Sequence, residues 1–202
     1  MFYNFLKIIV RPIFFLLYRV KLIGGEHAKY EGGMMLISNH VSATDPIFMH
    51  LVVKPKVYFM AKEELFKNPL LRAIIKAFGA FPVNRGKGDM EAIKTCFKLI
   101  KQGRTIGIFP EGTRSKTGEL LRFQPGVSMI AVRTHADILP VYLDGKMRIF
   151  HKNYIVMGAP FNLAEEFKEL KLSNVELMKQ STEVVRGRIL ALKEQLAQCK
   201  SS

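Results

Sequence analysis

The segment from Met34 to Pro46, M-M-L-I-S-N-H-V-S-A-T-D-P, decides the fold of this chain. Its first four residues are apolar and predict a strand that is buried on both faces. Asp45 and Pro46 then predict the start of a short helix, with Asp45 as the N-cap and Pro46 in the first turn. A buried strand that leads directly into a helix is typical of an α/β domain.

The same alternation continues along the rest of the sequence. Further apolar runs predict strands at residues 57–60, 81–83, 105–109, 138–143 and 154–157. Helical patterns fall between them at residues 69–78, 90–102 and 127–134, and a capping box, Ser173 to Glu176, opens a long helix that reaches about residue 198. We therefore predict a single α/β domain with a mixed, largely parallel sheet flanked by helices.

Composition limits the class of protein and of partner. The chain has 202 residues, which suits one domain, and its 49% apolar content excludes a disordered chain. With 31 basic and 17 acidic residues the net charge is +14, which favours an anionic partner such as nucleic acid, acidic lipid or a phosphorylated substrate. Its two cysteines, Cys96 and Cys199, are too few for a disulfide framework and indicate a reducing compartment.

The N-terminal residues have a membrane-binding character. No acidic residue precedes Glu26, and the uncharged run at residues 12–18 is far shorter than the roughly 20 residues that span a bilayer. On a helix the basic residues cluster within about 160°, and the aromatic and aliphatic residues lie mostly opposite. The basic set is Lys7, Arg11, Arg19 and Lys21, and the apolar set is Phe2, Phe5, Ile9, Phe14 and Leu16.

This pattern predicts that residues 1–22 form an amphipathic helical segment that docks on a membrane, followed by the domain proper at residues 23–202. Pro12 predicts a kink or a division into two short helices. The alternative is an ordinary helix packed on the body of the domain. Docking would place the protein at the cytoplasmic face of the membrane, as a peripheral or monotopic protein.

The loop after the first predicted strand carries a candidate catalytic pair. In open α/β sheets ligands bind beyond the carboxyl ends of the strands. His40 and Asp45, five residues apart, can meet within such a loop. A carboxylate bonded to one ring nitrogen leaves the other nitrogen to accept a proton. Because no G-x-S-x-G nucleophile occurs in the chain, such a pair would activate a hydroxyl that the substrate carries.

Simpler explanations exist for both residues. Asp45 can serve only as a helix cap, and His40 can be an ordinary turn histidine. No second histidine or carboxylate stands nearby at metal-ligand spacing, so no metal is predicted.

A second polar segment, F-P-E-G-T-R-S at residues 109–115, follows another predicted strand. Gly112 allows close backbone approach to a ligand, and the Arg114 guanidinium suits a phosphate. Thr113 and Ser115 offer hydroxyls, and Glu111 can accept hydrogen bonds from substrate hydroxyls or orient Arg114. Arg85 ends a third segment, residues 79–85, also beyond a strand. The alternatives are a polar turn for residues 109–115 and a solvated or ion-paired side chain for Arg85.

Together these motifs resemble the glycerolipid acyltransferase family, in particular its small bacterial 1-acylglycerol-3-phosphate acyltransferases. Four blocks of that family occur in order. The N-H-x-x-x-x-D block is matched by Asn39, His40 and Asp45, the G-x-x-x-x-x-R block by residues 79–85, the F-P-E-G-T-R-S block by residues 109–115, and an apolar block around a proline by residues 138–141. Two positions depart from the pattern: Val41 stands where glutamine is frequent, and Asn84 where aspartate is frequent.

The resemblance implies an enzyme of phospholipid biosynthesis. His40 would be the general base and Asp45 its orienting partner, with the free hydroxyl of a lysolipid attacking the thioester of acyl-CoA or an acyl carrier protein to give phosphatidic acid. The thioester would be a co-substrate, and neither cofactor nor metal is implied. The residues implied in substrate binding are Asn39, Arg85, Glu111, Gly112, Thr113, Arg114 and Ser115.

Two other functions fit parts of the sequence. One is acylation of glycerol 3-phosphate or of another lysolipid. The other is a non-catalytic basic module that binds acidic membrane or RNA. RNA modules usually present aromatic residues on a sheet face, whereas the densest phenylalanine cluster here is N-terminal and amphipathic. Binding alone would also leave the His40–Asp45 pair unexplained, so we expect no nucleic-acid partner.

Overall fold

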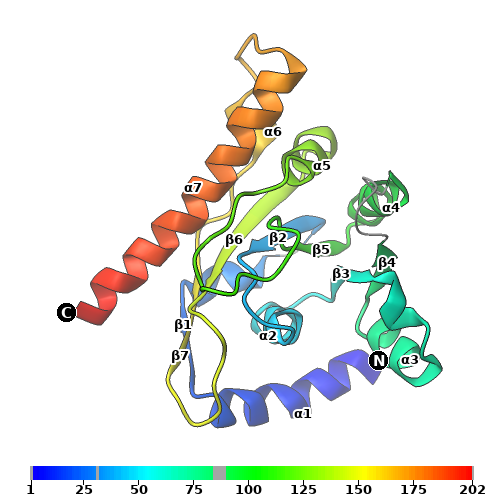
Figure 1. The fold of residues 1–202 in the computed structure, drawn as a ribbon, viewed down its shortest axis with the longest axis vertical. Coiled ribbons are helices and arrows are strands. Elements are labelled where there is room, and N and C mark those ends of the chain that lie inside the picture. The colour runs from blue at the N-terminus through cyan, green and yellow to red at the C-terminus, as the bar shows by residue number, and fades with distance from the viewer. Residues whose placement is uncertain (1, 31, 84–89, 202) are drawn as a thin grey trace.

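The computed structural model describes residues 2–30, 32–83 and 90–201. Seven strands form one sheet in the order β1-β7-β6-β2-β5-β3-β4 (Figure 1). The strands are β1 (Val20–Ile23), β2 (Met34–Ser38), β3 (Val57–Lys62), β4 (Phe81–Val83), β5 (Thr105–Ile108), β6 (Asp137–Leu143) and β7 (Asn153–Met157). The helices are α1 (Phe2–Leu17), α2 (Asp45–Val52), α3 (Pro69–Ala77), α4 (Met90–Lys101), α5 (Gly126–Thr134), α6 (Leu163–Glu166) and α7 (Asn174–Ser201), with short 3₁₀ turns at Gly25–Lys29 and Glu63–Phe66.

Parallel pairing dominates the sheet, as predicted. The central strand β2 pairs in parallel with β5 and β6, and β3 pairs in parallel with β5 and β4. Only β7 runs antiparallel to its neighbour β6, and β1 then runs parallel to β7. The mixed, largely parallel α/β fold is therefore confirmed. Strand β1 was not predicted, because three of its four residues lie within residues 1–22, which were predicted to be helical.

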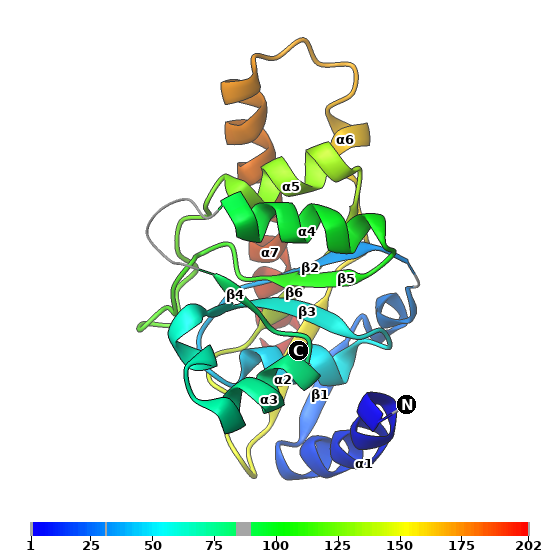
Figure 2. The same ribbon diagram turned by 90° about the vertical axis from the view of Figure 1, so that its right-hand side faces the viewer.

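Helices cover both faces of the sheet. Figure 2 shows α4 and α5 on one side, and α1, α2 and α3 on the other. In β2, Met35 and Ile37 enter the core beneath α4, α5 and α7, whereas Met34 and Leu36 enter the core beneath α2. Each such side chain contributes roughly 1.5–3 kcal/mol when fully buried. This two-sided burial explains why the strand reads as a continuous apolar run.

Helix α1 differs from the predicted segment in three ways. It is continuous through Pro12 rather than split. It ends at Leu17, and the chain then enters β1 of the sheet. Lys7, expected on an exposed basic face, instead donates hydrogen bonds to the carbonyls of Val53 and Lys54 at the end of α2. Carbonyls at a helix C-terminus attract cations, and burial, with the charge of Arg11, lowers the pKa of Lys7 to about 8.

Other side chains of α1 divide between the core and the solvent. Phe14 packs edge-on against Phe48 of α2, with ring centroids 5.8 Å apart. Ile8, Ile13 and Leu16 stay exposed, at 73%, 50% and 79%. The side chains of Phe2 and Phe5 lie outside the described residues. None of the described helices is both long enough and apolar enough to cross a bilayer.

His50, near the end of α2, is buried at 4% exposure. Its ring lies edge-on to Phe59 and Phe78, with centroids 5.2 and 5.8 Å away. Burial lowers the pKa of His50 to about 3, and the positive charges of Lys7 and Lys56 act in the same direction. The folded protein therefore holds this imidazole neutral at any ordinary pH.

We predict that His50 makes the protein sensitive to mild acid. Unfolded His50 takes a proton near pH 6.5, whereas folded His50 does so only near pH 3. The unfolded state then binds more protons, so the free energy of unfolding should fall below pH 6.5, by at most about 1.4 kcal/mol per pH unit from this group. Urea unfolding at pH 7, 6 and 5 measures this slope.

The variant His50→Leu should reduce that slope. His135→Asn is the matched control, because His135 is exposed and holds a left-handed backbone conformation that asparagine tolerates. An equal slope in His50→Leu and in the parent protein would contradict the prediction.

Candidate active site

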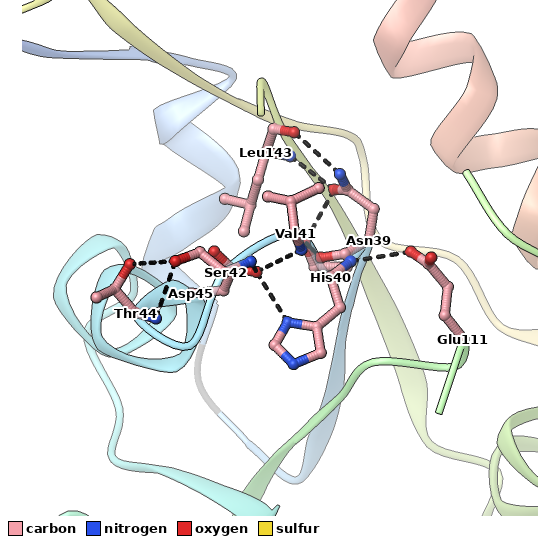
Figure 3. A network of polar contacts seen from close by, with 9 residues as sticks. Asn39, His40, Val41, Ser42, Thr44, Asp45, Glu111 and Leu143 are labelled. Atoms are coloured by element: carbon pink, nitrogen blue, oxygen red, sulfur yellow. Dashed lines mark hydrogen bonds and ion pairs between the residues drawn. The ribbon is translucent and has the colours of Figure 1, made fainter. Parts of the chain in front are cut away.

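The His40–Asp45 pair lies just beyond the carboxyl end of β2 (Figure 3). His40 follows the strand by two residues, and Asp45 is the first residue of α2. Their side chains meet with Nδ1 2.8 Å from Oδ2, so the predicted contact is confirmed. Asp45 is fully buried, and His40 is 8% exposed. Since a carboxylate only accepts, Nδ1 is assigned the proton and Nε2 is left as the acceptor.

The carboxylate of Asp45 serves the loop before the helix. Its Oδ2 also accepts hydrogen bonds from the backbone N–H groups of Val41 and Ser42, both at 2.7 Å. Thr44, not Asp45, is the N-cap residue, and it makes no side-chain cap bond. The simple capping explanation for Asp45 is therefore wrong. The three donors fix the loop from His40 to Ser42 around one oxygen.

Asn39 and Glu111 brace the same loop. The amide of Asn39 pairs with the backbone of Leu143 at the end of β6, donating to its carbonyl at 2.9 Å and accepting from its N–H at 2.8 Å. Glu111 accepts from the N–H of His40 at 2.9 Å and from the N–H of Leu121 at 3.2 Å. Both side chains are buried, and burial raises the pKa of Glu111. A direct contact with substrate stays a prediction for both residues.

In the rest of the 109–115 segment, Ser115 is buried and hydrogen-bonded, whereas residues 112–114 are exposed. Ser115 is buried, its N–H donates to the carbonyl of His40 at 2.8 Å, and its hydroxyl accepts from the N–H of Gly118 at 3.1 Å. Gly112 has a φ of +69°, which suits glycine in this turn. Thr113 and Arg114 are exposed. The loop after β5 thus presents Thr113 and Arg114 to solvent beside His40.

Arg85, the third predicted element, lies outside the described residues, as does Asn84. The strand before them, β4, ends at Val83. Val83 lines the same cavity as His40. Strand β4 therefore ends at the edge of the site.

An aromatic stack and an apolar cavity flank the histidine. The ring of His40 lies parallel to Phe109, with centroids 4.1 Å apart, and Phe109 stacks in turn on Phe59 at 5.6 Å. A cavity of about 150 Å³ beside them is lined by His40, Met60, Val83, Gly107, Ile108, Phe109 and Gly112. A second cavity of about 200 Å³ shares five of these residues and extends beneath α4 and α5.

Sequence reasoning missed the residues that shape this cavity. Met60 lies in no motif, and Val83 occupies an unspecified position of the 79–85 block. Only the order of the strands places β3 beside β5 and β4 beside β3. Within residues 2–30, 32–83 and 90–201, no group of three or more His, Cys, Asp or Glu side chains could hold a metal ion.

The site can be compared with known proteins. The profile of the family described as Acyltransferase matches residues 19–144, which include His40, Asp45 and the whole 109–115 segment. The chain belongs to the acyltransferase family. The resemblance inferred from the four blocks is thereby confirmed.

Individual relatives agree with this assignment. The acyltransferase is 31% identical to the 1-acyl-sn-glycerol-3-phosphate acyltransferase of Bacillus subtilis, over 89% of this chain and 90% of that protein. It is 30% identical to the enzyme of the same name from Borreliella burgdorferi, over 85% and 70%. The crystal structure of the 1-acyl-sn-glycerophosphate acyltransferase PlsC from Thermotoga maritima superposes with a TM-score of 0.65 at 31% identity, over 86% of this chain and 72% of that one.

We predict that Gly107 of β5 is needed for the aromatic stack. A Cβ at this position would lie 2.1 Å from the ring of Phe59, so Gly107→Ala must displace a ring that supports Phe109 and, through it, His40. Overpacking of this kind costs about 1–3 kcal/mol. Urea unfolding should show that loss, and turnover should fall with it.

Gly187→Ala is the control. Nothing lies within 4 Å of a Cβ at Gly187 in α7, so this change should stabilise the protein by about 0.5–1 kcal/mol. If Gly107→Ala matched the parent in both stability and turnover, the stack would not constrain the site.

Proposed function

We propose that this acyltransferase transfers a fatty acyl group from an acyl thioester to the free sn-2 hydroxyl of 1-acylglycerol 3-phosphate, forming phosphatidic acid. The observation that carries the proposal is the buried, oriented His40–Asp45 pair beside an apolar cavity. The names of the relatives support the choice of substrate. Membership of an enzyme family also favours catalysis over a purely binding role.

The reaction follows from the geometry of the pair. Nε2 of His40 removes the proton from the lysolipid hydroxyl as its oxygen attacks the thioester carbonyl. Asp45 holds the Nδ1 proton and stabilises the imidazolium that forms, and the face of Phe109 is well placed to stabilise the same charge. The intermediate then collapses: the new C–O bond remains, the C–S bond breaks, and the thiolate takes the proton from His40. No acyl-enzyme forms.

Two parts of the site accommodate the developing charge and the acyl chain. The N–H of Gly112 donates to the carbonyl of Phe109, so the backbone N–H groups of Thr113 and Arg114 are our proposed donors to the oxyanion. The paired apolar cavities are the proposed place of the acyl chain. Each methylene buried there contributes about 0.8 kcal/mol.

The phosphate of the acceptor is assigned to the basic side chains around the site. Arg114 is exposed and directly precedes Ser115, whose N–H donates to the carbonyl of His40, and Arg85 is predicted to join it. A guanidinium matches a phosphate with two parallel hydrogen bonds. The thioester donor is acyl-CoA or an acyl carrier protein. The alternative acceptors, glycerol 3-phosphate and other lysolipids, are distinguished by measuring thioester consumption with each acceptor and with none.

We further propose that the protein works at the cytoplasmic face of an anionic membrane, as a peripheral or monotopic protein. Helix α1 presents Ile8, Ile13 and Leu16 to solvent, and Arg11 and Arg19 are exposed with them. Such a surface suits an interfacial helix. Lys7 contributes little, since its ammonium is bound at the end of α2.

We predict that His40→Ala abolishes most of the activity without unfolding the protein. Loss of a general base should lower turnover by about 10²–10⁴-fold. Release of free thiol from the thioester, with lysophosphatidate as acceptor, measures turnover, and circular dichroism reports the fold. A folded His40→Ala protein with nearly normal turnover would refute the mechanism.

A further prediction concerns Arg114. Replacing it with alanine should remove one charged contact of about 1.5–3 kcal/mol and raise the apparent KM for the lysolipid about 10–150-fold. The KM for the thioester should change much less. Arg133→Ala, at an exposed position in the last turn of α5, is the control and should change neither constant. Equal effects on both substrates would assign Arg114 another role.

A further inference from the structure

Two surface elements lie at the same end of the molecule as α1. They are helix α3 and the loop between β6 and β7, residues 144–152, and both views place all three at the lower end (Figures 1 and 2). The loop is joined to α1 directly, because the N–H of Phe150 donates to the carbonyl of Leu17 at 2.7 Å. The three elements therefore lie together at one end of the protein.

The β6–β7 loop holds apolar side chains out into solvent in a fixed geometry. Ile149 is 48% exposed and Phe150 is 70% exposed. Phe150 has a φ of +63°, a conformation rarely adopted by bulky residues. Asn153, itself buried, holds the loop in this form. Its side chain donates to the carbonyls of Arg148 and His151 at 2.8 and 2.9 Å and accepts from the N–H of Arg148 at 2.8 Å.

Helix α3 is formed without contributing a buried side chain to the core. None of its residues is buried, and three of its apolar side chains, Leu70, Leu71 and Ile74, are 72%, 37% and 49% exposed, while Ile75 is half-buried. Its two ends are nevertheless capped. Asn68 accepts from the N–H of Leu71 at 3.0 Å, and Lys56 donates to the carbonyl of Ala77 at 2.8 Å. An uncovered apolar face on a surface helix is typical of a site that contacts a partner outside the chain.

The charges around these elements indicate the chemistry of that partner. No acidic residue occurs in residues 1–25, 65–88 or 145–164. These stretches contain α1, α3 and all of the β6–β7 loop except Asp144, whose carboxylate pairs with Lys200 of α7. Residues 65–83 and 145–164, which the structure describes, contain six lysines and arginines. They are Lys67, Arg72, Lys76, Lys146, Arg148 and Lys152. A second copy of this basic surface would repel the first. A bilayer with anionic headgroups satisfies both the apolar and the basic side chains.

We propose that α3 and the Ile149–Phe150 tip of the β6–β7 loop insert into an anionic membrane together with α1, as a three-part docking surface. This inference deepens the membrane docking in the proposed function and rests on it. Three separated contacts fix an orientation, which a single helix does not. The loop begins directly after Leu143, whose backbone pairs with Asn39, the neighbour of His40. Docking of the loop thus also orients the catalytic loop relative to the lipid.

The absence of tryptophan from the chain allows a direct test. Phe150→Trp and Leu70→Trp each introduce one fluorescent reporter. Gln180→Trp is the control, at an exposed position near the start of α7, at the opposite end of the molecule (Figure 1). Each protein is mixed with phosphatidylcholine–phosphatidylglycerol vesicles with or without brominated acyl chains. We expect a blue shift and quenching at positions 150 and 70, and neither at position 180.

Polar substitutions provide the second measurement. Ile149→Ser with Phe150→Ser, and Leu70→Ser with Ile74→Ser, should each weaken partitioning into these vesicles by at least about tenfold. Turnover on a water-soluble short-chain lysolipid should be unchanged, which also shows that the variants fold. Val175→Ser, which removes a 78% exposed apolar side chain from α7, should leave partitioning unchanged.

Three results would overturn the proposal, each in a distinct way. Sedimentation with vesicles without quenching at positions 150 and 70 would leave α1 as the docking element. A blue shift that needs no lipid and grows with protein concentration would indicate pairing with a second copy. Failure of the parent protein to sediment with vesicles would refute membrane docking altogether. The comparison of His40→Ala with the parent protein in the acyl-transfer assay would still test the proposed mechanism independently.

Discussion

Burial of the Asp45 carboxylate is the constraint on which the site depends. A fully buried carboxylate is tolerated only where hydrogen-bond donors replace water. The donors are the His40 ring and the N–H groups of Val41 and Ser42, all from the loop that joins β2 to α2. That loop must therefore curl around one oxygen, and the histidine is oriented as a consequence. The proposed general base and the turn that carries it are therefore one structural unit.

Further hydrogen bonds connect the loop after β2 to the ends of the two neighbouring strands, β5 and β6. The backbone of His40 bonds on both sides to the loop after β5, through Glu111 and Ser115. Asn39 bonds to the end of β6. Because β5 and β6 flank β2 in parallel, their carboxyl ends meet at one edge of the sheet. Several motif residues thus hold the protein together at the site, whereas Arg114 is exposed.

The end of the molecule that carries α1 differs from the site, because it leaves apolar side chains exposed. Apolar side chains that would stabilise an ordinary core are held in solvent on α1, α3 and the β6–β7 loop, while Lys7 is directed inward. In the membrane docking that we propose, burial of these side chains in lipid would replace burial in the core. The same chain that braces three loops around His40 therefore leaves its amphipathic elements uncovered.

Local patterns were enough to predict most elements and the contact between His40 and Asp45. The apolar runs, the Ser173–Glu176 capping box and the five-residue spacing of His40 and Asp45 act through neighbours in sequence, so they can be read directly. The other features join residues far apart in the chain. Asn39 meets a residue 104 positions away and Glu111 one 71 positions away. Strand β1 forms only because β7 lies beside it, and Lys7 turns inward only because α2 ends there. Such partners depend on strand order and helix packing, which only the tertiary structure decides.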